Sequence, residues 1–300
     1  MTPFEELYRL ETTPEALEET SQYIANKLKP FLQIMEPVLI CYPDRGPKSL
    51  GAVFKRAVEL CGAVAIEWGP DFRWQELLRL AFDSHANTVI AHPLIALGLV
   101  KLAQHTHTPL YIYDVVFSGY SYAGWMVENV KRGLDCRVWG CYAEKYTPIV
   151  AGFTCDKEAG LHIREDVFDL LVLDEQGKRI PFPQRGRIFF ASKRNPDVIY
   201  DVEESAIVHY QPCSCGSDSP RILENKRAAD CNDAKFLDEK ILDWASVLDF
   251  RATNTDNGLK LELVVFPDEV LPELPNCAQL TVRAWDPETD IPFFFQENYL

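Results

Sequence analysis

Short apolar runs alternate with amphipathic segments along the first half of the chain. Each run is followed by apolar positions at helical spacing, and several runs are apolar throughout instead of alternating with polar residues. This pattern is typical of parallel strands whose two faces are covered by helices. The expected strands are residues 38–42, 63–68, 88–91, 110–117 and 136–142, and the expected helices are residues 12–35, 49–61, 74–81, 93–103 and 121–133.

Capping and stop signals set the limits of these helices. Thr12 followed by Glu15 predicts a capping box at the start of the first helix, and Pro37 follows its end. Ser121 is the expected cap of the last helix in this series, and Gly133 is its expected left-handed stop.

The pattern changes after residue 143. Short extended runs are separated by turn-forming residues, and no long helical period appears. We therefore expect an antiparallel β-region. Its strands are predicted at residues 149–153, 162–163, 167–173, 187–191, 198–202 and 207–210.

A third pattern begins near residue 225. Residues 236–244 have a helical period, and the Asn257-Gly258 pair between two apolar runs predicts a hairpin. The expected strands are residues 248–252, 259–266 and 279–285. The predicted fold is thus α/β, with a parallel βαβ sheet layer (1–143), an antiparallel β-rich part (144–224) and a small α+β module (225–300).

Composition narrows the function classes. Hydrophobic residues make up 47% of the 300 residues, which excludes a disordered chain. The net charge of −15 disfavours nucleic acid as a main partner. No apolar run approaches the roughly 20 residues of a membrane helix, and the first residues are acidic and polar, unlike a signal peptide. A cytoplasmic location without membrane contact is therefore expected.

The nine cysteines do not suggest a disulfide framework, because their number is odd and no export signal precedes them. Cys213 and Cys215 lie one residue apart in a predicted loop that continues into Gly216. Two thiolates on such a turn can bind the same ion, and zinc prefers four Cys or His ligands.

The other two ligands of such a site are open from spacing alone. Cys155 and His162 are candidates, and His209 and Cys231 are alternatives. The competing interpretation is a set of reduced surface cysteines and ordinary core histidines. A further pair, His105 and His107, is interpreted as a solvated connector.

Common catalytic motifs are missing from the sequence. It contains no GxSxG, HExxH or GxGxxG pattern. The loop from Asp44 to Ser49 opens a predicted helix, where backbone N–H groups can hold an anion. It lacks the glycine spacing of a Walker A loop, so we interpret it as an ordinary strand-to-helix turn.

A series of motifs in the central part of the chain resembles the phenylacetate–CoA ligase branch of the adenylate-forming enzymes, which includes coenzyme F390 synthetase-like proteins. The order and rough spacing match that branch over residues 36–222. The motifs are Trp139-Gly140 with Glu144, Cys155 with Gly160-Leu161-His162, Gly186-Arg187, Ile199-Tyr200, and Pro212-Cys213-Ser214-Cys215-Gly216.

The resemblance implies an activity and contacts for it. Enzymes of this family join a carboxylate to ATP as an acyl-adenylate, with Mg²⁺, and many then transfer the acyl group to CoA. Glu144 is the implied catalytic residue near metal and nucleotide, with Trp139 and Gly140 in its strand motif. Tyr200 and Glu204 match the ribose-binding motif, in which the family has Asp where this chain has Glu.

The resemblance also implies a structural zinc site. Several enzymes of the branch bind zinc through a Cys, a His from a Gly-Leu-His segment and the two cysteines of a Cys-x-Cys-Gly loop. In this chain those residues are Cys155, His162, Cys213 and Cys215. Four protein ligands leave no open coordination position, which is typical of a structural metal.

Two family features have no counterpart in the sequence. No Ser/Thr/Gly-rich phosphate loop precedes the first matching strand. The C-terminal lysine is not identified, although Lys226, Lys235 and Lys240 lie in the region. Two main hypotheses follow: a shortened ligase that uses a small carboxylate and a nucleotide, or a catalytically inactive, zinc-stabilised descendant that binds a partner protein. A third is a subunit whose phosphate loop is supplied by another chain.

Overall fold

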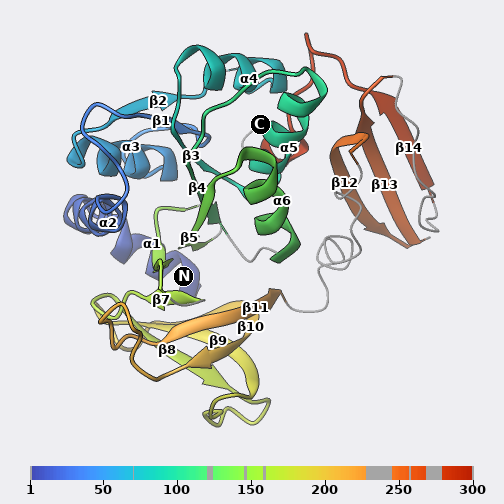
Figure 1. Ribbon diagram of the computed structural model, residues 1–300. Helices are drawn as coiled ribbons and strands as arrows, with labels where there is room; N and C mark the ends of the chain where they lie inside the picture. The colour runs from blue at the N-terminus through green and yellow to red at the C-terminus, as the bar shows by residue number, and fades with distance from the viewer. Residues whose placement is uncertain are drawn as a thin grey trace.

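Five parallel strands form one half of an eleven-stranded sheet (Figure 1). The structure is a computed structural model, and it describes residues 2–69, 71–119, 124–144, 147–157, 160–227, 245–256, 258–267 and 279–298. The order of the parallel strands is β2-β1-β3-β4-β5. Their bounds are β1 Pro37–Ile40, β2 Val64–Glu67, β3 Thr88–Ala91, β4 Asp114–Gly119 and β5 Arg137–Ala143. All five predicted strands are confirmed.

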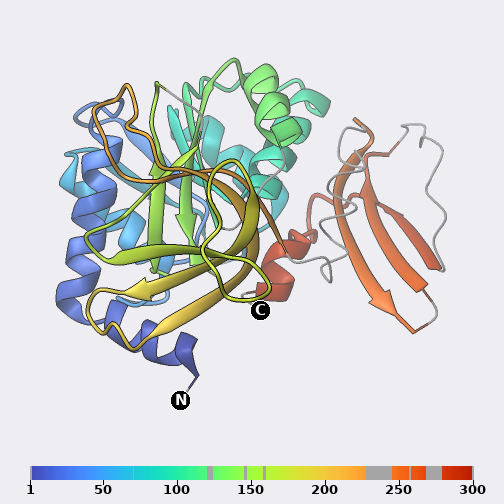
Figure 2. The ribbon, with the colours of Figure 1, turned by 90° about the horizontal axis from the view of Figure 1, so that it is seen from below.

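Helices cover both faces of this half. The helices α2 and α3 lie on one face and α5 and α6 on the other, as two views at right angles show (Figures 1 and 2). Gly98 lets α5 approach α4, because a Cβ there would lie 2.1 Å from the Trp74 ring. The bounds are α2 Pro14–Leu28, α3 Leu50–Leu60, α4 Trp74–Asp83, α5 Pro93–His105 and α6 Gly124–Leu134.

The start of the chain differs from the prediction. The expected capping box at Thr12 and Glu15 is wrong: Thr13 caps α2, and its hydroxyl accepts from the backbone N–H of Ala16. An additional helix, α1 (Pro3–Glu11), precedes it, with a capping box between Thr2 and Glu5. The single helix predicted over 12–35 therefore ends at Leu28. The short α1 carries one fully buried apolar residue, Leu7, so its apolar period is weak.

The end of α6 also differs. Gly133 was the expected stop, but the helix continues to Leu134 and Asp135 adopts the left-handed conformation (φ 51°). A Cβ on Gly133 would lie 2.2 Å from Val100 of α5, so this glycine serves the contact between the two helices. The predicted cap, Ser121, lies outside the described residues.

The second half of the large sheet is antiparallel from β5 onward, as predicted. Its order is β6-β7-β11-β10-β9-β8. The runs 198–202 and 207–210 form one strand, β10, with an irregularity near Glu203 (φ 62°). Strand β11 was not predicted. The bounds are β6 Val150–Thr154, β7 Leu161–Ile163, β8 Phe168–Leu173, β9 Arg185–Ser192, β10 Ile199–His209 and β11 Arg221–Arg227.

A three-stranded sheet and a short helix form the last part. Strands β12 (Val247–Thr255) and β13 (Gly258–Val265) are antiparallel, and β14 (Gln279–Ala284) is parallel to β13. The buried Lys101 on α5 donates to the Val247 carbonyl at 2.6 Å. Helix α8 (Phe293–Asn298) is tied to β12, because the Asp249 carboxylate accepts from the Phe293 N–H at 2.8 Å. The predicted helix 236–244 lies outside the described residues.

Two apolar clusters form the core. The larger one joins the parallel half of the sheet, its helices and the last module, and the smaller one fills the antiparallel half.

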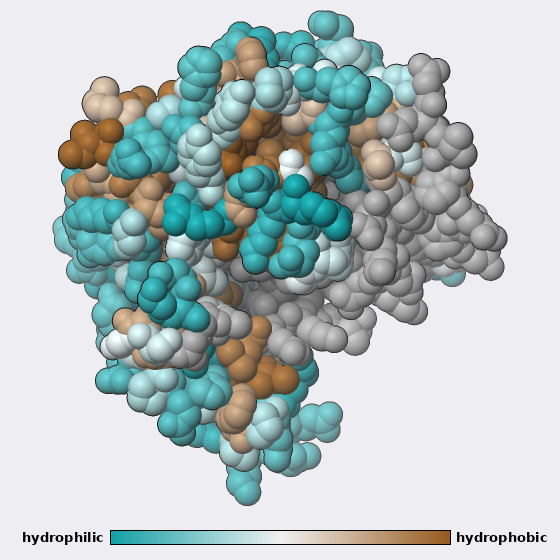
Figure 3. Space-filling view, viewed as in Figure 1, coloured by the Kyte–Doolittle hydropathy of each residue, from teal (hydrophilic) through white to brown (hydrophobic). Residues whose placement is uncertain are grey.

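The large sheet continues across residue 143, and β11 crosses residue 224, so both predicted boundaries fall inside continuous hydrogen-bonded structure. On the described part of the face seen in Figure 3, hydrophilic residues cover much of the surface, with hydrophobic patches between them. Among the described helices, none has the length and apolarity to cross a membrane.

Candidate metal centre and carboxylate cluster

Four predicted zinc ligands lie together at one end of the antiparallel half. Cys155 follows β6, His162 is in β7, and Cys213 and Cys215 are in the loop between β10 and β11. Because β7 lies between β6 and β11, the sheet brings these three chain segments side by side. The four ligand atoms all lie within 4.8 Å of one another.

The distances fit a tetrahedral ion. The Sγ atoms of Cys155 and Cys213 are 3.7 Å apart, and Cys215 Sγ is 3.5 Å from His162 Nε2. Tetrahedral zinc with sulfur at about 2.3 Å and nitrogen at about 2.0 Å separates two sulfurs by about 3.8 Å and sulfur from nitrogen by about 3.5 Å. Soft thiolates with one imidazole are also the donor set that zinc prefers. The residues therefore fit this metal.

Local structure holds the ligands in place. The Ser219 hydroxyl is 3.2 Å from His162 Nδ1, which directs Nε2 toward Cys215. Gly160 has φ 109°, and a Cβ there would lie 2.9 Å from the Ile222 carbonyl oxygen, so the turn before His162 needs glycine. Burial raises the pKa of the Cys213 thiol to about 11.

The alternative ligands lie elsewhere. His209 Nδ1 is 3.1 Å from an Arg221 nitrogen, and its ring contacts Phe182, away from the four-residue centre. Cys231 lies outside the described residues.

The predicted solvated connector is partly wrong, since the His105 ring stacks on Phe266 at 4.1 Å, although His107 is exposed. The Asp44–Ser49 loop is a strand-to-helix turn in which Ser49 caps α3.

A second group of predicted residues forms a buried cluster. Glu144 follows β5 and accepts from the Tyr200 hydroxyl at 2.8 Å. Glu204 accepts from the Tyr142 hydroxyl at 3.1 Å. The pairs are crossed: β5 supplies Tyr142 and, at its end, Glu144, whereas β10 supplies Tyr200 and Glu204. Glu144 is 5% exposed and Glu204 is 3% exposed.

This cluster joins two strands that are not neighbours in the sheet. Between β5 and β10 lie β6, β7 and β11, so the antiparallel half must curl to bring them together. Burial, followed by the charges of Glu204 and Glu144, raises the pKa of Tyr142 well above its ordinary value. The Tyr142 hydroxyl therefore keeps its proton and remains a donor to Glu204.

Tyr142 was not predicted as a site residue. A usable signal is its place two residues before Glu144, because side chains two apart along a strand share a face. Trp139 lies three residues before Tyr142, so the same rule places their side chains on opposite faces of the strand. The structure accordingly does not bring Trp139 to the cluster. Its indole donates to Asp114 at 2.7 Å and its ring stacks on Phe31. The Gly140 N–H donates to Thr154 at 2.8 Å.

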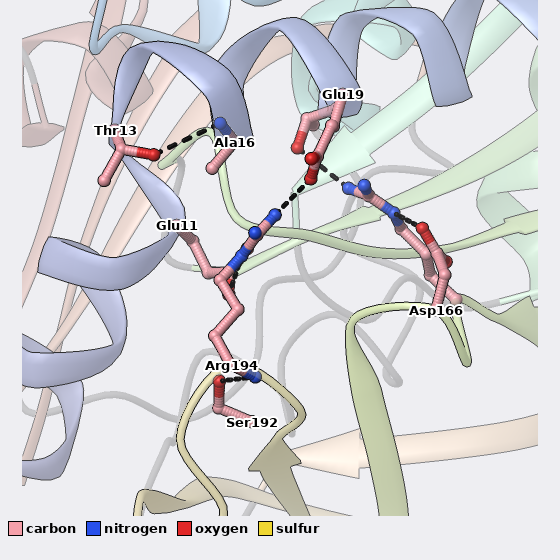
Figure 4. A network of polar contacts seen from close by, with 9 residues as sticks. Glu11, Thr13, Ala16, Glu19, Asp166, Ser192 and Arg194 are labelled. Atoms are coloured by element: carbon pink, nitrogen blue, oxygen red, sulfur yellow. Dashed lines mark hydrogen bonds and ion pairs between the residues drawn. The ribbon is translucent and has the colours of Figure 1, made fainter.

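An ion-pair network fixes the first two helices to the β9–β10 turn (Figure 4). The Arg194 guanidinium contacts the carboxylates of Glu11, at the end of α1, and Glu19 on α2. Glu11 is almost fully buried, and this burial raises the pKa of its carboxyl group despite the opposing effect of Arg194. The Glu11–Arg194 ion pair therefore fixes the end of α1, although removing the Glu11 carboxylate from water is unfavourable.

We expect Arg194→Ala to lower the free energy of unfolding by about 2 kcal/mol, because it leaves the Glu11 carboxylate buried without its guanidinium. Glu11→Gln should cost less than about 1 kcal/mol. The folded-state pKa of Glu11 is raised, so its contribution to stability is complete below its unfolded pKa and declines as pH rises through the folded value.

Urea unfolding of the three proteins between pH 4.5 and 8 measures both effects. The stability of the native chain relative to Glu11→Gln should be greatest at the acid end. Equal losses for Arg194→Ala and Glu11→Gln at pH 8 would contradict the assignment.

Comparison with known proteins identifies the fold of this chain. No family model and no curated protein sequence matches the chain. A solved structure of 2-hydroxyisobutyryl-CoA ligase in the postadenylation state, in complex with R3-HIB-AMP, matches with a TM-score of 0.67 and 13% identity over 92% of this chain and 67% of that chain. This chain has the fold of the adenylate-forming CoA ligases.

Other solved structures agree with this fold. An open form of 2-hydroxyisobutyryl-CoA ligase with 2-HIB-AMP and CoA gives a TM-score of 0.61 at 14% identity over 83% of this chain. The anthranilate-CoA ligase AuaEII, in complex with anthranoyl-AMP, gives 0.55 at 9% identity over 93% of it. The chain spans 59% and 63% of the lengths of these two ligases.

Proposed function

We propose that this chain activates a carboxylate as an acyl-adenylate, in the manner of an AMP-forming acid–thiol ligase. The observation that carries the proposal is the ligase fold together with the convergence of Glu144, Tyr200 and Glu204 from separate strands. The motif resemblance favours an aryl or acyl carboxylate as substrate, CoA as acceptor and the phenylacetate–CoA ligase branch as the nearest group.

In this reaction a carboxylate oxygen bonds to the α-phosphorus of ATP while the bond to the β-phosphate oxygen breaks, releasing pyrophosphate. The CoA thiol then attacks the acyl carbon, and AMP leaves. A bound magnesium ion would neutralise part of the negative charge of the phosphates. Glu144 is the proposed group near metal and nucleotide, and Glu204 the proposed ribose contact. The Tyr200 and Tyr142 hydroxyls hold these two carboxylates in place.

Exchange of labelled pyrophosphate into ATP tests the proposal, because it needs only the first step. We expect carboxylate-dependent exchange across a panel of aryl and acyl acids with metal-replete protein and Mg²⁺. Absence of exchange with every acid would contradict it. Lys226 lies in β11, whereas Lys235 and Lys240 lie outside the described residues, so no lysine is assigned to the reaction.

We also propose that the four-residue centre holds structural zinc. Support comes from the match between the observed Cys155–Cys213 and Cys215–His162 distances and a tetrahedral ion. All four positions are filled by protein groups, so the ion has no site for substrate. Its effect is to fix the β10–β11 loop to β6 and β7.

The burial of both cluster carboxylates favours a second candidate function. Glu144 and Glu204 are both almost fully buried, and each accepts a hydrogen bond from a tyrosine hydroxyl. Carboxylates used in this way stabilise the fold, as expected in a binding protein that does not adenylate a substrate. Calorimetry with ATP and Mg²⁺ separates the candidates, since micromolar binding would count against this one. A cytoplasmic location remains a proposal under either function.

A further inference from the structure

Helix α1 packs against the tyrosine side of the carboxylate cluster. The Phe4 ring lies 5.3 Å from the ring of Tyr200, whose hydroxyl donates to Glu144. Leu7, with 0% exposure, is part of the same apolar cluster as Tyr142 and Tyr200. The two tyrosines that hold the carboxylates therefore share one apolar cluster with this short helix.

The enclosing helix is a small element with few anchors. It has nine residues, and Phe4, Tyr8 and Leu10 are only half-buried. Its end is fixed by the contact of Glu11 with Arg194, which belongs to the β9–β10 turn and not to the parallel half of the sheet. An element with one fully buried apolar side chain and an ion pair at its end opens at lower free energy than the strands beneath it.

We propose that α1 is an intramolecular plug of the nucleotide site, and that a nucleotide reaches Glu144 and Glu204 only when α1 lifts from β10. The inference rests on the proposed function, because it takes these carboxylates as nucleotide contacts. With such a plug, the apparent dissociation constant for the nucleotide equals the intrinsic constant divided by the fraction of molecules in which α1 is lifted. Variants that release α1 therefore tighten binding without touching the site itself.

The same linkage works in the opposite direction. If α1 must lift for AMP to bind, bound AMP must favour the lifted helix by the same factor. Saturating AMP should then accelerate amide hydrogen exchange in residues 3–11. A ligand bound elsewhere would leave those amides unchanged or slow them.

The test compares AMP binding by calorimetry in four full-length proteins. Leu7→Ser removes the buried anchor and should lower the apparent dissociation constant for AMP by about tenfold or more. Phe4→Ala removes the ring above Tyr200 and should lower it several-fold while disturbing the fold less. Arg9→Ala is the matched control, because Arg9 is exposed on the other face of α1, and its constant should equal that of the native chain.

The outcomes separate the plug from the proposed function. Tighter AMP binding in the released variants supports the plug even if no protein catalyses pyrophosphate exchange, which would contradict only the ligase activity. Equal rates of pyrophosphate exchange and equal AMP affinities in the native and released proteins would overturn the plug and leave the proposed activity intact. Released variants with a native circular dichroism spectrum that still bind no AMP would also overturn it. If Leu7→Ser does not fold, Phe4→Ala and the hydrogen-exchange response decide.

Discussion

Cys213→Ser should remove the bound zinc and lower the free energy of unfolding by at least about 3 kcal/mol. Cys213 is almost fully buried, and its Sγ lies 3.7 Å from that of Cys155. A serine hydroxyl is a poor zinc ligand, and a structural metal contributes its binding free energy to folding. The change should therefore affect a large part of the stability of the β-region.

Elemental analysis and urea unfolding, each with and without a chelator, measure this effect. The native chain should carry about one zinc, and Cys213→Ser should carry none. Cys136→Ser is the matched control, because Cys136 is a half-buried free cysteine outside the centre. A native chain purified without metal, whose stability is insensitive to the chelator, would refute the zinc assignment.

Glu144→Gln should reduce pyrophosphate exchange by about 100-fold to 1,000-fold, the range found when one electrostatic contact to a transition state is removed. The amide is nearly isosteric and retains an oxygen that can accept from the Tyr200 hydroxyl, so the fold should be preserved. The loss should appear in the maximal exchange rate, because the missing charge acts on the metal and the phosphates.

An exposed acid provides the comparison. Glu165→Gln changes the net charge by the same amount on the surface and should leave the exchange rate within about twofold. Native exchange by Glu144→Gln would show that this carboxylate lies outside the reacting centre.

The sequence predicts the metal centre better than it predicts the rest of the site. Cys213 and Cys215 are close in the chain, so their convergence is local. The family resemblance selected Cys155 and His162 from the four candidates that spacing had left open. The spacing alone left His209 open, because a position in sequence does not reveal that its ring faces Phe182.

The carboxylate cluster shows where local reasoning stops. Glu144 and Glu204 were identified by motif, but their tyrosine partners depend on the curl of the sheet, which no single segment encodes. Trp139 was assigned to the nucleotide because it precedes Glu144 in the motif, yet its indole is directed to Asp114. The strand that leads to Glu144 was predictable, whereas the direction of each side chain depended on register.

The missed elements have weak local signals for physical reasons. The sequence of strand β11 is rich in charge, with Arg221, Glu224, Lys226 and Arg227. Ile222 is buried, and the strand is defined by its pairing with β10. Helix α1 depends on the burial of Leu7 against strands that are more than 130 residues away in the sequence. Their stability comes from tertiary contacts more than from propensity.

Strand β10 ties the two sites to a single register. Tyr200 and Glu204 are fastened to β5 in its first half, and four residues after its last residue the chain enters the zinc loop at Cys213. Sliding β10 by one residue would turn every side chain to the opposite face. If the proposed zinc is bound at Cys213, it fixes the end of this strand, and we expect its removal to loosen the hydrogen bond between Tyr142 and Glu204.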